Sequence, residues 1–101
     1  MIKKVLITRE ILSDGPDLLR KYGLDVELNN LNRPFSYEEL NDRAQNADAI
    51  ISMLSDRIDQ GFLLKNKQLK VISNYAVGYN NIDIEAATKL KIPVGNTPDV
   101  L

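Results

Sequence analysis

Five short apolar runs alternate with polar, helix-compatible segments along the chain. They cover residues 4–8 (KVLIT), 24–28 (LDVEL), 48–54 (DAIISML), 69–74 (LKVISN) and 92–95 (IPVG). Runs of this length and composition are typical of β-strands. The run at 48–54 is almost continuously apolar, as expected of a strand buried on both faces, whereas the run at 24–28 alternates apolar and acidic residues like an edge strand.

The segment after residue 34 carries the clearest helix-start signal. Ser36 and Glu39 have the spacing of a capping box, in which each residue's side chain accepts a hydrogen bond from the other's backbone N–H. Phe35 and Leu40 flank them at the positions of a hydrophobic staple. Together these residues predict a helix that runs to about Asn46.

Three further helices are predicted between the remaining runs. A Gly-Pro step begins a short helix that Gly23 ends, because proline is favoured at the first helical position and glycine just after the last. Asp59 and Asp83 are placed to cap the other two, over residues 58–65 and 84–90.

This alternation of strands and helices predicts the architecture. Short connections between successive elements imply a parallel sheet with right-handed crossovers and helices on both faces. Five strands within 101 residues favour the flavodoxin-like order 2-1-3-4-5, an α/β three-layer sandwich. The length corresponds to a single domain over residues 1–101.

Composition removes several classes of function. The chain has 13 basic and 14 acidic residues, a net charge of −1 and no basic stripe, so nucleic acid is not an expected partner. Cys and His are absent, which excludes thiolate metal sites, a thiol nucleophile and the usual proton-transfer side chain. No run approaches the roughly 20 apolar residues of a membrane span, and the start MIKKVLITRE is too quickly charged for a signal peptide. A cytoplasmic protein is therefore expected.

In an open parallel sheet, ligands bind beyond the carboxyl ends of the strands. A phosphoacceptor receiver domain needs an acidic cluster after the first strand, an Asp ending the third and a Lys ending the fifth. Here Glu10 follows the first strand, Asp56 comes after the third, and no Lys ends the fifth. The stretch REILSDG (9–15) is too bulky and acidic for a flavodoxin phosphate loop. Neither a G-x-G-x-x-G nor a Walker loop occurs, so no nucleotide site is encoded.

The turn NYAVGYNNID (74–83) is the remaining candidate. Gly78 would let the backbone take a positive φ, so that successive N–H groups, those of Val77 and Gly78, converge on an anion near the start of the following helix. Alternatively, Gly78 only makes the turn, and Asn80 and Asn81 satisfy nearby backbone groups.

Residues 71–101, VISNYAVGYNNIDIEAATKLKIPVGNTPDVL, closely resemble the N-terminal part of D-isomer-specific 2-hydroxyacid dehydrogenases, especially the glyoxylate/hydroxypyruvate reductase branch. The stretch ISMLSDRID (51–59) agrees with the same pattern. The resemblance implies a two-domain enzyme that reduces a small 2-oxo acid with NADH or NADPH. It also implies that the Val77 and Gly78 N–H groups hold the substrate carboxylate and that Leu54 packs against the substrate. For Leu54, core packing at a strand end is the alternative.

The same resemblance implies what these residues lack. The family's substrate-binding Arg, its Glu, its His general acid and its glycine-rich NAD(P) loop lie in or after a Rossmann domain. We therefore expect a truncated substrate-binding fragment with no catalytic, cofactor-binding or metal-binding residues, inactive alone and without the C-terminal helix that covers one sheet face. Self-association into a homo-oligomer through that uncovered face is expected. The alternative is a stand-alone flavodoxin-like binding or interaction module.

One departure from the family's pattern concerns the end of the last helix. Lys91 stands where the family usually has a glycine in a left-handed turn. A lysine there is expected to cost about 1 kcal/mol if the left-handed conformation is kept.

Overall fold

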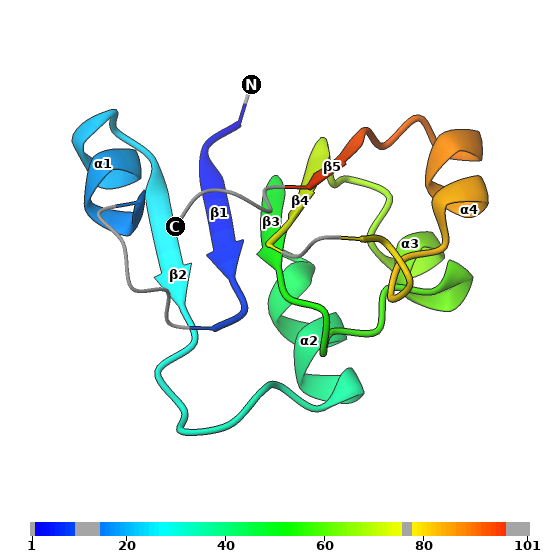
Figure 1. The fold of residues 1–101 in the computed structure, drawn as a ribbon. Coiled ribbons are helices and arrows are strands. Elements are labelled where there is room, and N and C mark those ends of the chain that lie inside the picture. Colours follow the sequence, from blue (N-terminus) through cyan, green and yellow to red (C-terminus); the bar gives the residue numbers. More distant parts are fainter. Residues whose placement is uncertain (1, 10–14, 76–77, 97–101) are drawn as a thin grey trace.

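The structure is a computed structural model that describes residues 2–9, 15–75 and 78–96. Within these residues, five strands pair in parallel in the order β2-β1-β3-β4-β5, and a helix lies between each strand and the next along the chain (Figure 1). The predicted flavodoxin-like order is thereby confirmed. The elements are β1 Lys4–Ile7, α1 Gly15–Lys21, β2 Asp25–Leu28, α2 Tyr37–Ala44, β3 Ala49–Ser52, α3 Gln60–Lys65, β4 Val71–Asn74, α4 Ile84–Lys89 and β5 Val94–Asn96.

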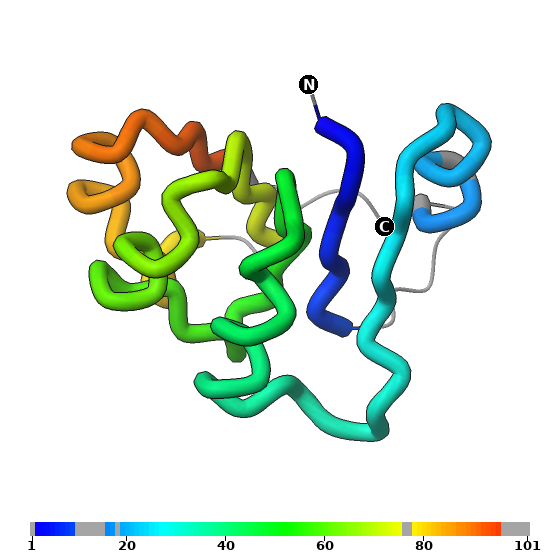
Figure 2. The backbone as a smooth tube through the Cα atoms, turned by 180° about the vertical axis from the view of Figure 1, so that it is seen from behind, coloured from blue at the N-terminus to red at the C-terminus, as the bar shows by residue number. Residues whose placement is uncertain are grey.

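The helices lie on both sides of the sheet, as predicted. Figure 2 shows α1 set apart from α2, α3 and α4, which gather on the other side. The face under α2, α3 and α4, here called the closed face, buries one cluster of fifteen hydrophobic side chains that includes Leu6, Ile50 and Ile72. In the cluster on the opposite face, here called the open face, only Val5, Ile7 and Ala49 are buried among the described residues. Successive strand residues point to opposite faces, so neighbours on one strand belong to different cores.

The helix starts follow the sequence signals. The Glu39 N–H donates to Ser36 Oγ at 3.1 Å and the Ser36 N–H donates to Glu39 Oε1 at 2.8 Å, which is the predicted capping box. Asp59 Oδ1 accepts from the Phe62 N–H at 2.9 Å and so caps α3 as predicted. The flanking Phe35 and Leu40 are both buried on the closed face.

Two helices end in Schellman motifs. At the end of α1, the Gly23 N–H donates to the Arg20 carbonyl at 2.9 Å, with Gly23 at φ 85°. At the end of α4, the Lys91 N–H donates to the Thr88 carbonyl at 3.0 Å, and Lys91 has φ 60°. Both residues take the left-handed conformation that this motif requires. Lys91 therefore keeps the turn that the family usually builds with glycine.

Several predicted boundaries were wrong by one or two residues, and two of these differences have a clear physical cause. Ile58 does not begin α3; it forms an isolated parallel bridge with Ile82. The last strand begins at Val94 and not at Ile92, because the Ile92 N–H closes the Schellman motif on the Ala87 carbonyl and Pro93 has no N–H to donate. No helix in the described parts of the chain is long and apolar enough to span a bilayer.

Candidate functional site

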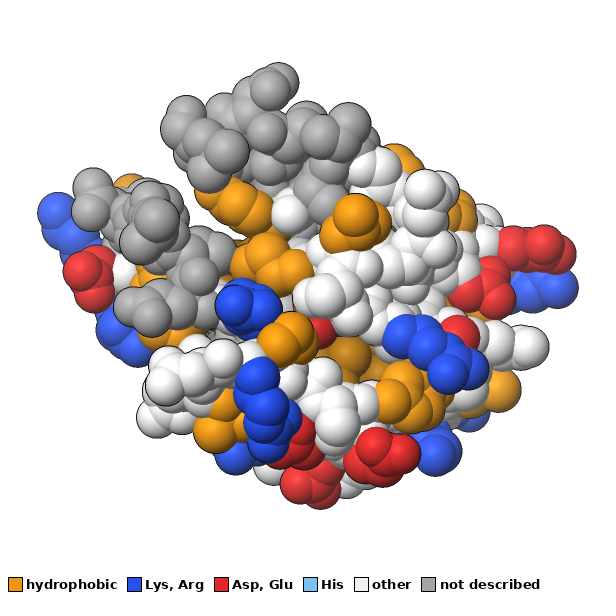
Figure 3. Space-filling view, turned by 60° about the horizontal axis from the view of Figure 1, so that its bottom comes forward, with side chains coloured by type: hydrophobic (Ala, Val, Ile, Leu, Met, Phe, Trp, Pro, Cys, Tyr) orange, Lys and Arg blue, Asp and Glu red, His pale blue; other side chains and the backbone are white. Residues whose placement is uncertain are grey.

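The carboxyl ends of the strands face the lower part of Figure 1, where the loops after β3 and β4 lie side by side. Figure 3 views this end and shows hydrophobic patches next to several basic side chains. The bridge between Ile58 and Ile82 joins the two loops: the Ile58 N–H donates to the Asn81 carbonyl and the Asp83 N–H donates to the Ile58 carbonyl, both at 2.9 Å. The loops thus continue the sheet pairing beyond the ends of the strands.

An asparagine pair fixes the loop after β4. Asn74 ends β4 with no exposed surface. Its Nδ2 donates to Asn81 Oδ1 at 3.0 Å, and Asn81 Nδ2 lies 3.2 Å from Asn74 Oδ1. The Ser52 hydroxyl, at the end of β3, donates to Asn74 Oδ1 at 2.9 Å. The alternative that the sequence left open has Asn80 and Asn81 satisfy nearby backbone groups; it does not identify Asn74 as the partner of Asn81.

Gly78 is held by this pair. Its carbonyl accepts from Asn74 Nδ2 at 2.8 Å, which fixes the peptide plane between Gly78 and Tyr79. The φ of Gly78 is defined in part by Val77, which lies outside the described residues, so its positive φ stays a prediction. A Cβ added to Gly78 would meet no atom of the described residues within 4 Å. The backbone here faces open space, and a missing side chain gives a ligand close access to it.

Of the other two predicted site residues, the structure describes Leu54 but not Val77. Val77, with Ala76, lies outside the described residues. Leu54 lies in the loop after β3, and its side chain is 57% exposed. Such exposure contradicts plain core packing at the end of β3. Its contact with a substrate remains a prediction.

The start of α4 is capped as the sequence predicts. Asp83 Oδ1 accepts from the Ala86 N–H at 2.9 Å, so a carboxylate of the protein itself already lies at this helix terminus. The same holds for α3 and its cap Asp59. These carboxylates would repel the pyrophosphate of a dinucleotide. Since the sequence also has no G-x-G-x-x-G, these residues do not fit a bound NAD(P).

Asp56 is a buried acid that the sequence did not point to as part of this site. Only 2% of its surface is exposed. Its Oδ2 accepts from the Thr8 hydroxyl, and from the Met53 N–H at 2.7 Å. Its Oδ1 has no hydrogen-bond partner in the described structure. Burial raises the pKa of Asp56 above its ordinary value, although the bonds from Thr8 and Met53 and the charge of Arg9 act in the opposite direction. Its position, four residues after the end of β3, is the only signal in the sequence that Asp56 belongs to the turn after that strand.

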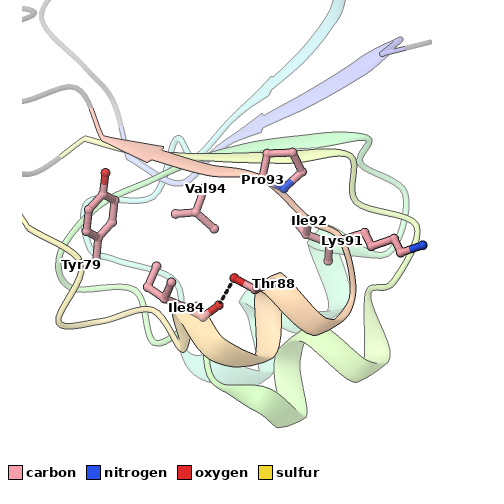
Figure 4. Close-up of a pocket in the computed structure, with 7 residues that line it drawn as sticks. All are labelled: Tyr79, Ile84, Thr88, Lys91, Ile92, Pro93 and Val94. Atoms are coloured by element: carbon pink, nitrogen blue, oxygen red, sulfur yellow. Dashed lines mark hydrogen bonds between the residues drawn. The ribbon is translucent and has the colours of Figure 1, made fainter.

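A pocket of about 430 Å³ lies between α4 and β5 (Figure 4). Ile84, Val94 and the ring of Tyr79 face into it, while the Lys91 side chain points away. The Thr88 hydroxyl donates to the Ile84 carbonyl at 2.9 Å and is therefore not aimed at a ligand. The pocket is lined by neither Leu54 nor Gly78. Its apolar walls do not suit a small carboxylate. Among the described residues, no group of three His, Cys, Asp or Glu side chains could hold a metal ion.

Comparison with known proteins identifies the family. The family model described as "D-isomer specific 2-hydroxyacid dehydrogenase, catalytic domain" matches residues 5–101. The chain belongs to this family.

The relatives agree with the match. The glyoxylate reductase of Thermococcus onnurineus is 46% identical over 101 residues, which is 100% of this chain and 30% of that protein. The crystal structure of the TT0316 protein of Thermus thermophilus has a TM-score of 0.89 at 39% identity, with 97% of this chain and 31% of that chain covered. An NAD+-bound 3-phosphoglycerate dehydrogenase of Entamoeba histolytica has a TM-score of 0.81 at 28% identity, with 97% and 33% covered. The chain thus spans about 30% of the length of the relatives it matches.

Proposed function

We propose that this chain is the substrate-binding part of an NAD(P)-dependent 2-oxo acid reductase of the glyoxylate reductase type. In this proposal the backbone N–H groups of Val77 and Gly78 hold the substrate carboxylate, and Leu54 covers the substrate from the neighbouring loop. The observation that carries it is the backbone at Gly78, which is fixed through its carbonyl and open on its Cα side. Identity of 46% to a glyoxylate reductase supports the choice of substrate class.

The chemistry of the site fits a small carboxylate better than a larger or neutral ligand. Backbone N–H groups bind an anion without a charged side chain, and they do so best where the backbone is already fixed. The exposed Leu54 offers an apolar surface at the neighbouring loop, where the short carbon chain of a 2-oxo acid would lie. In this proposal the backbone at Gly78 binds the carboxylate, and Leu54 contacts the carbon chain.

Affinity should be low in these 101 residues alone. Each backbone hydrogen bond contributes about 1 kcal/mol net, and binding must also offset the lost freedom of the ligand. Two such bonds support dissociation constants in the millimolar range or weaker. The chain has no His for proton transfer and no G-x-G-x-x-G loop for a dinucleotide. In this proposal the NAD(P) site, the proton donor and a cationic carboxylate partner come from a Rossmann domain outside these 101 residues.

The test compares ligands that differ only in the carboxylate. Saturation-transfer NMR should show glyoxylate binding to the chain and no binding of glycolaldehyde, which is neutral and of similar size. Equal binding of both compounds would contradict a carboxylate site and favour a binding module of another kind. In a parallel assay, the chain mixed with NADPH or NADH and glyoxylate should oxidise no cofactor. Turnover by the purified chain would contradict the proposal that the NAD(P) site and the proton donor lie outside these 101 residues.

A further inference from the structure

The sequence offered Asn81 only as a residue that satisfies nearby backbone groups, and neither the sequence nor the family pattern gave it a role in joining the two loops of the site. We propose that Asn81 is a positioning residue, whose amide fixes the turn that carries Leu54 relative to the turn that carries Gly78. The inference rests on the proposed function, because it concerns how that substrate site is held in shape. Asn81 itself would not contact the substrate.

One end of the connection is the turn Met53–Asp56. Asn81 Nδ2 donates to the Met53 carbonyl at 3.0 Å and to the Asp56 carbonyl at 2.8 Å. These two carbonyls bracket Leu54, so a single amide group spans the turn that presents it. The turn is also closed from within, since the Asp56 N–H donates to the Met53 carbonyl at 2.9 Å. The Leu54 side chain is exposed, so its position depends on the hydrogen-bonded backbone of this turn.

The other end of the connection is Gly78. Asn81 Oδ1 accepts from Asn74 Nδ2 at 3.0 Å, and the same Nδ2 donates to the Gly78 carbonyl at 2.8 Å. An unbroken series of hydrogen bonds therefore runs from the Leu54 turn through Asn81 and Asn74 to Gly78. Asn74 has no exposed surface, so the middle of this series is shielded from competing water, whereas Asn81 and Gly78 at its ends are half-buried.

Only an amide provides this connection, because position 81 must both donate and accept. Aspartate would keep the acceptor but would place a carboxylate against the Met53 carbonyl, the Asp56 carbonyl and Asn74 Oδ1. Alanine would remove both functions and leave buried carbonyls with fewer donors. Serine would keep a single hydroxyl donor on a shorter side chain, and so part of the connection. The neighbouring Asn80 is exposed and offers a matched control in the same loop.

The first experiment needs no ligand. Backbone 15N relaxation of the 101-residue chain should show Leu54, Ser55 and Gly78 nearly as ordered as the strands. In N81A and N81D, order should fall in both loops together, while N80A should match the wild type. N41A provides the control for general destabilisation, since Asn41 is equally an amide on a backbone carbonyl, at 2.9 Å from Tyr37 O, but lies in α2. If N81A does not fold, N81S replaces it and should give an intermediate loss of order.

The second experiment measures glyoxylate affinity in the same variants. N81A should bind at least fivefold more weakly than the wild type, N81S should lie between them, and N41A and N80A should stay within about a factor of 1.5. Unchanged loop order in N81A, or a change in only one loop, would overturn the inference. A loss of order or affinity that N41A reproduces would overturn it as well. If the wild type itself ignores glyoxylate, the proposed function fails, and the relaxation data still decide whether Asn81 couples the two loops.

Discussion

The two faces of the sheet differ in how completely they are covered. On the closed face, three helices bury fifteen hydrophobic side chains, many with no exposed surface at all. On the open face, α1 supplies Leu19, and seven hydrophobic side chains around the three buried ones remain partly exposed. A strand such as β3 takes part in both, because Ile50 lies in the first core and Ile51 borders the second.

This difference shows where the candidate site obtains its rigidity. The two site loops leave β3 and β4 and lead into α3 and α4, which are both packed on the closed face. Their side-chain bonds through Asn74 and Asn81 add to that packing. The site therefore depends on the well-packed half of the molecule and not on the face that α1 covers in part.

The largest expected effect compares two neighbouring isoleucines on β3. I50A removes a side chain with no exposed surface and should lower the free energy of unfolding by about 3 kcal/mol. I51A removes a partly exposed side chain and should cost only about 1 kcal/mol, since less apolar area returns to water. Urea unfolding followed by circular dichroism measures both.

Equal costs for the two variants would contradict the contrast between the faces. A cost at Ile51 that grows with protein concentration would instead show that a second copy covers the open face. That outcome would support the homo-oligomer that the sequence led us to expect, and sedimentation velocity over the same concentrations would display it.

The next effect compares the two Schellman motifs, one at each face. Gly23 has φ 85°, so G23A should destabilise the protein by about 1 kcal/mol even though a Cβ there meets nothing within 4 Å. Lys91 has φ 60°, so K91G should stabilise the protein by up to about 1 kcal/mol. K91A is the control: alanine keeps the strain and should bring no gain. Thermal melts of the three variants decide, and a loss of stability in K91G would refute the strain at Lys91.

A smaller effect concerns pH. The carboxylates of Glu39 and Asp56 should change the free energy of unfolding in opposite directions as the pH rises. Hydrogen bonds from the Arg33 side chain, and then from the Ser36 backbone, lower the pKa of Glu39 from 4.5 to about 2. Its stabilising contribution is therefore present above pH 4.5 and is lost as the pH falls toward 2. Burial raises the pKa of Asp56 above its ordinary 3.8, so its contribution declines as the pH rises from 3.8 through the raised value.

Substitution by the neutral amides separates the two carboxylates. In urea unfolding between pH 2 and pH 7, E39Q should flatten the loss of stability on the acid side. D56N should flatten the decline in stability that accompanies a rise in pH above 3.8. The fold should be kept, because an asparagine oxygen can still accept from the Met53 N–H. An E39Q profile that matches the wild type below pH 4 would contradict the role given to the capping box.

Most of the fold follows from local signals in the sequence. The capping residues Ser36, Asp59 and Asp83 each act within three residues of themselves, so their patterns could be recognised without knowledge of the sheet. The strand order follows from the short connections between elements. Ile58 was misplaced because its partner Ile82 lies far along the chain.

The candidate site could be predicted only in part. The turn around Gly78 was located from its sequence, but its anchoring by the Asn74 side chain was not, because that bond forms only when the turn folds back on the end of β4. Asn81 meets residues 53 and 56 only after β3 and β4 have paired. The buried state of Asp56 depends in the same way on Thr8, which is 48 positions away.

The central claim is that the loops on the well-packed half of the molecule form a site for a small carboxylate. The most direct measurement is a residue-resolved NMR titration of the 15N-labelled chain with glyoxylate. The account predicts saturable shifts of the Gly78 and Leu54 amide signals, with the amides of α1 and β2 unmoved. No response at Gly78, or shifts that are as large in α1 and β2, would contradict it.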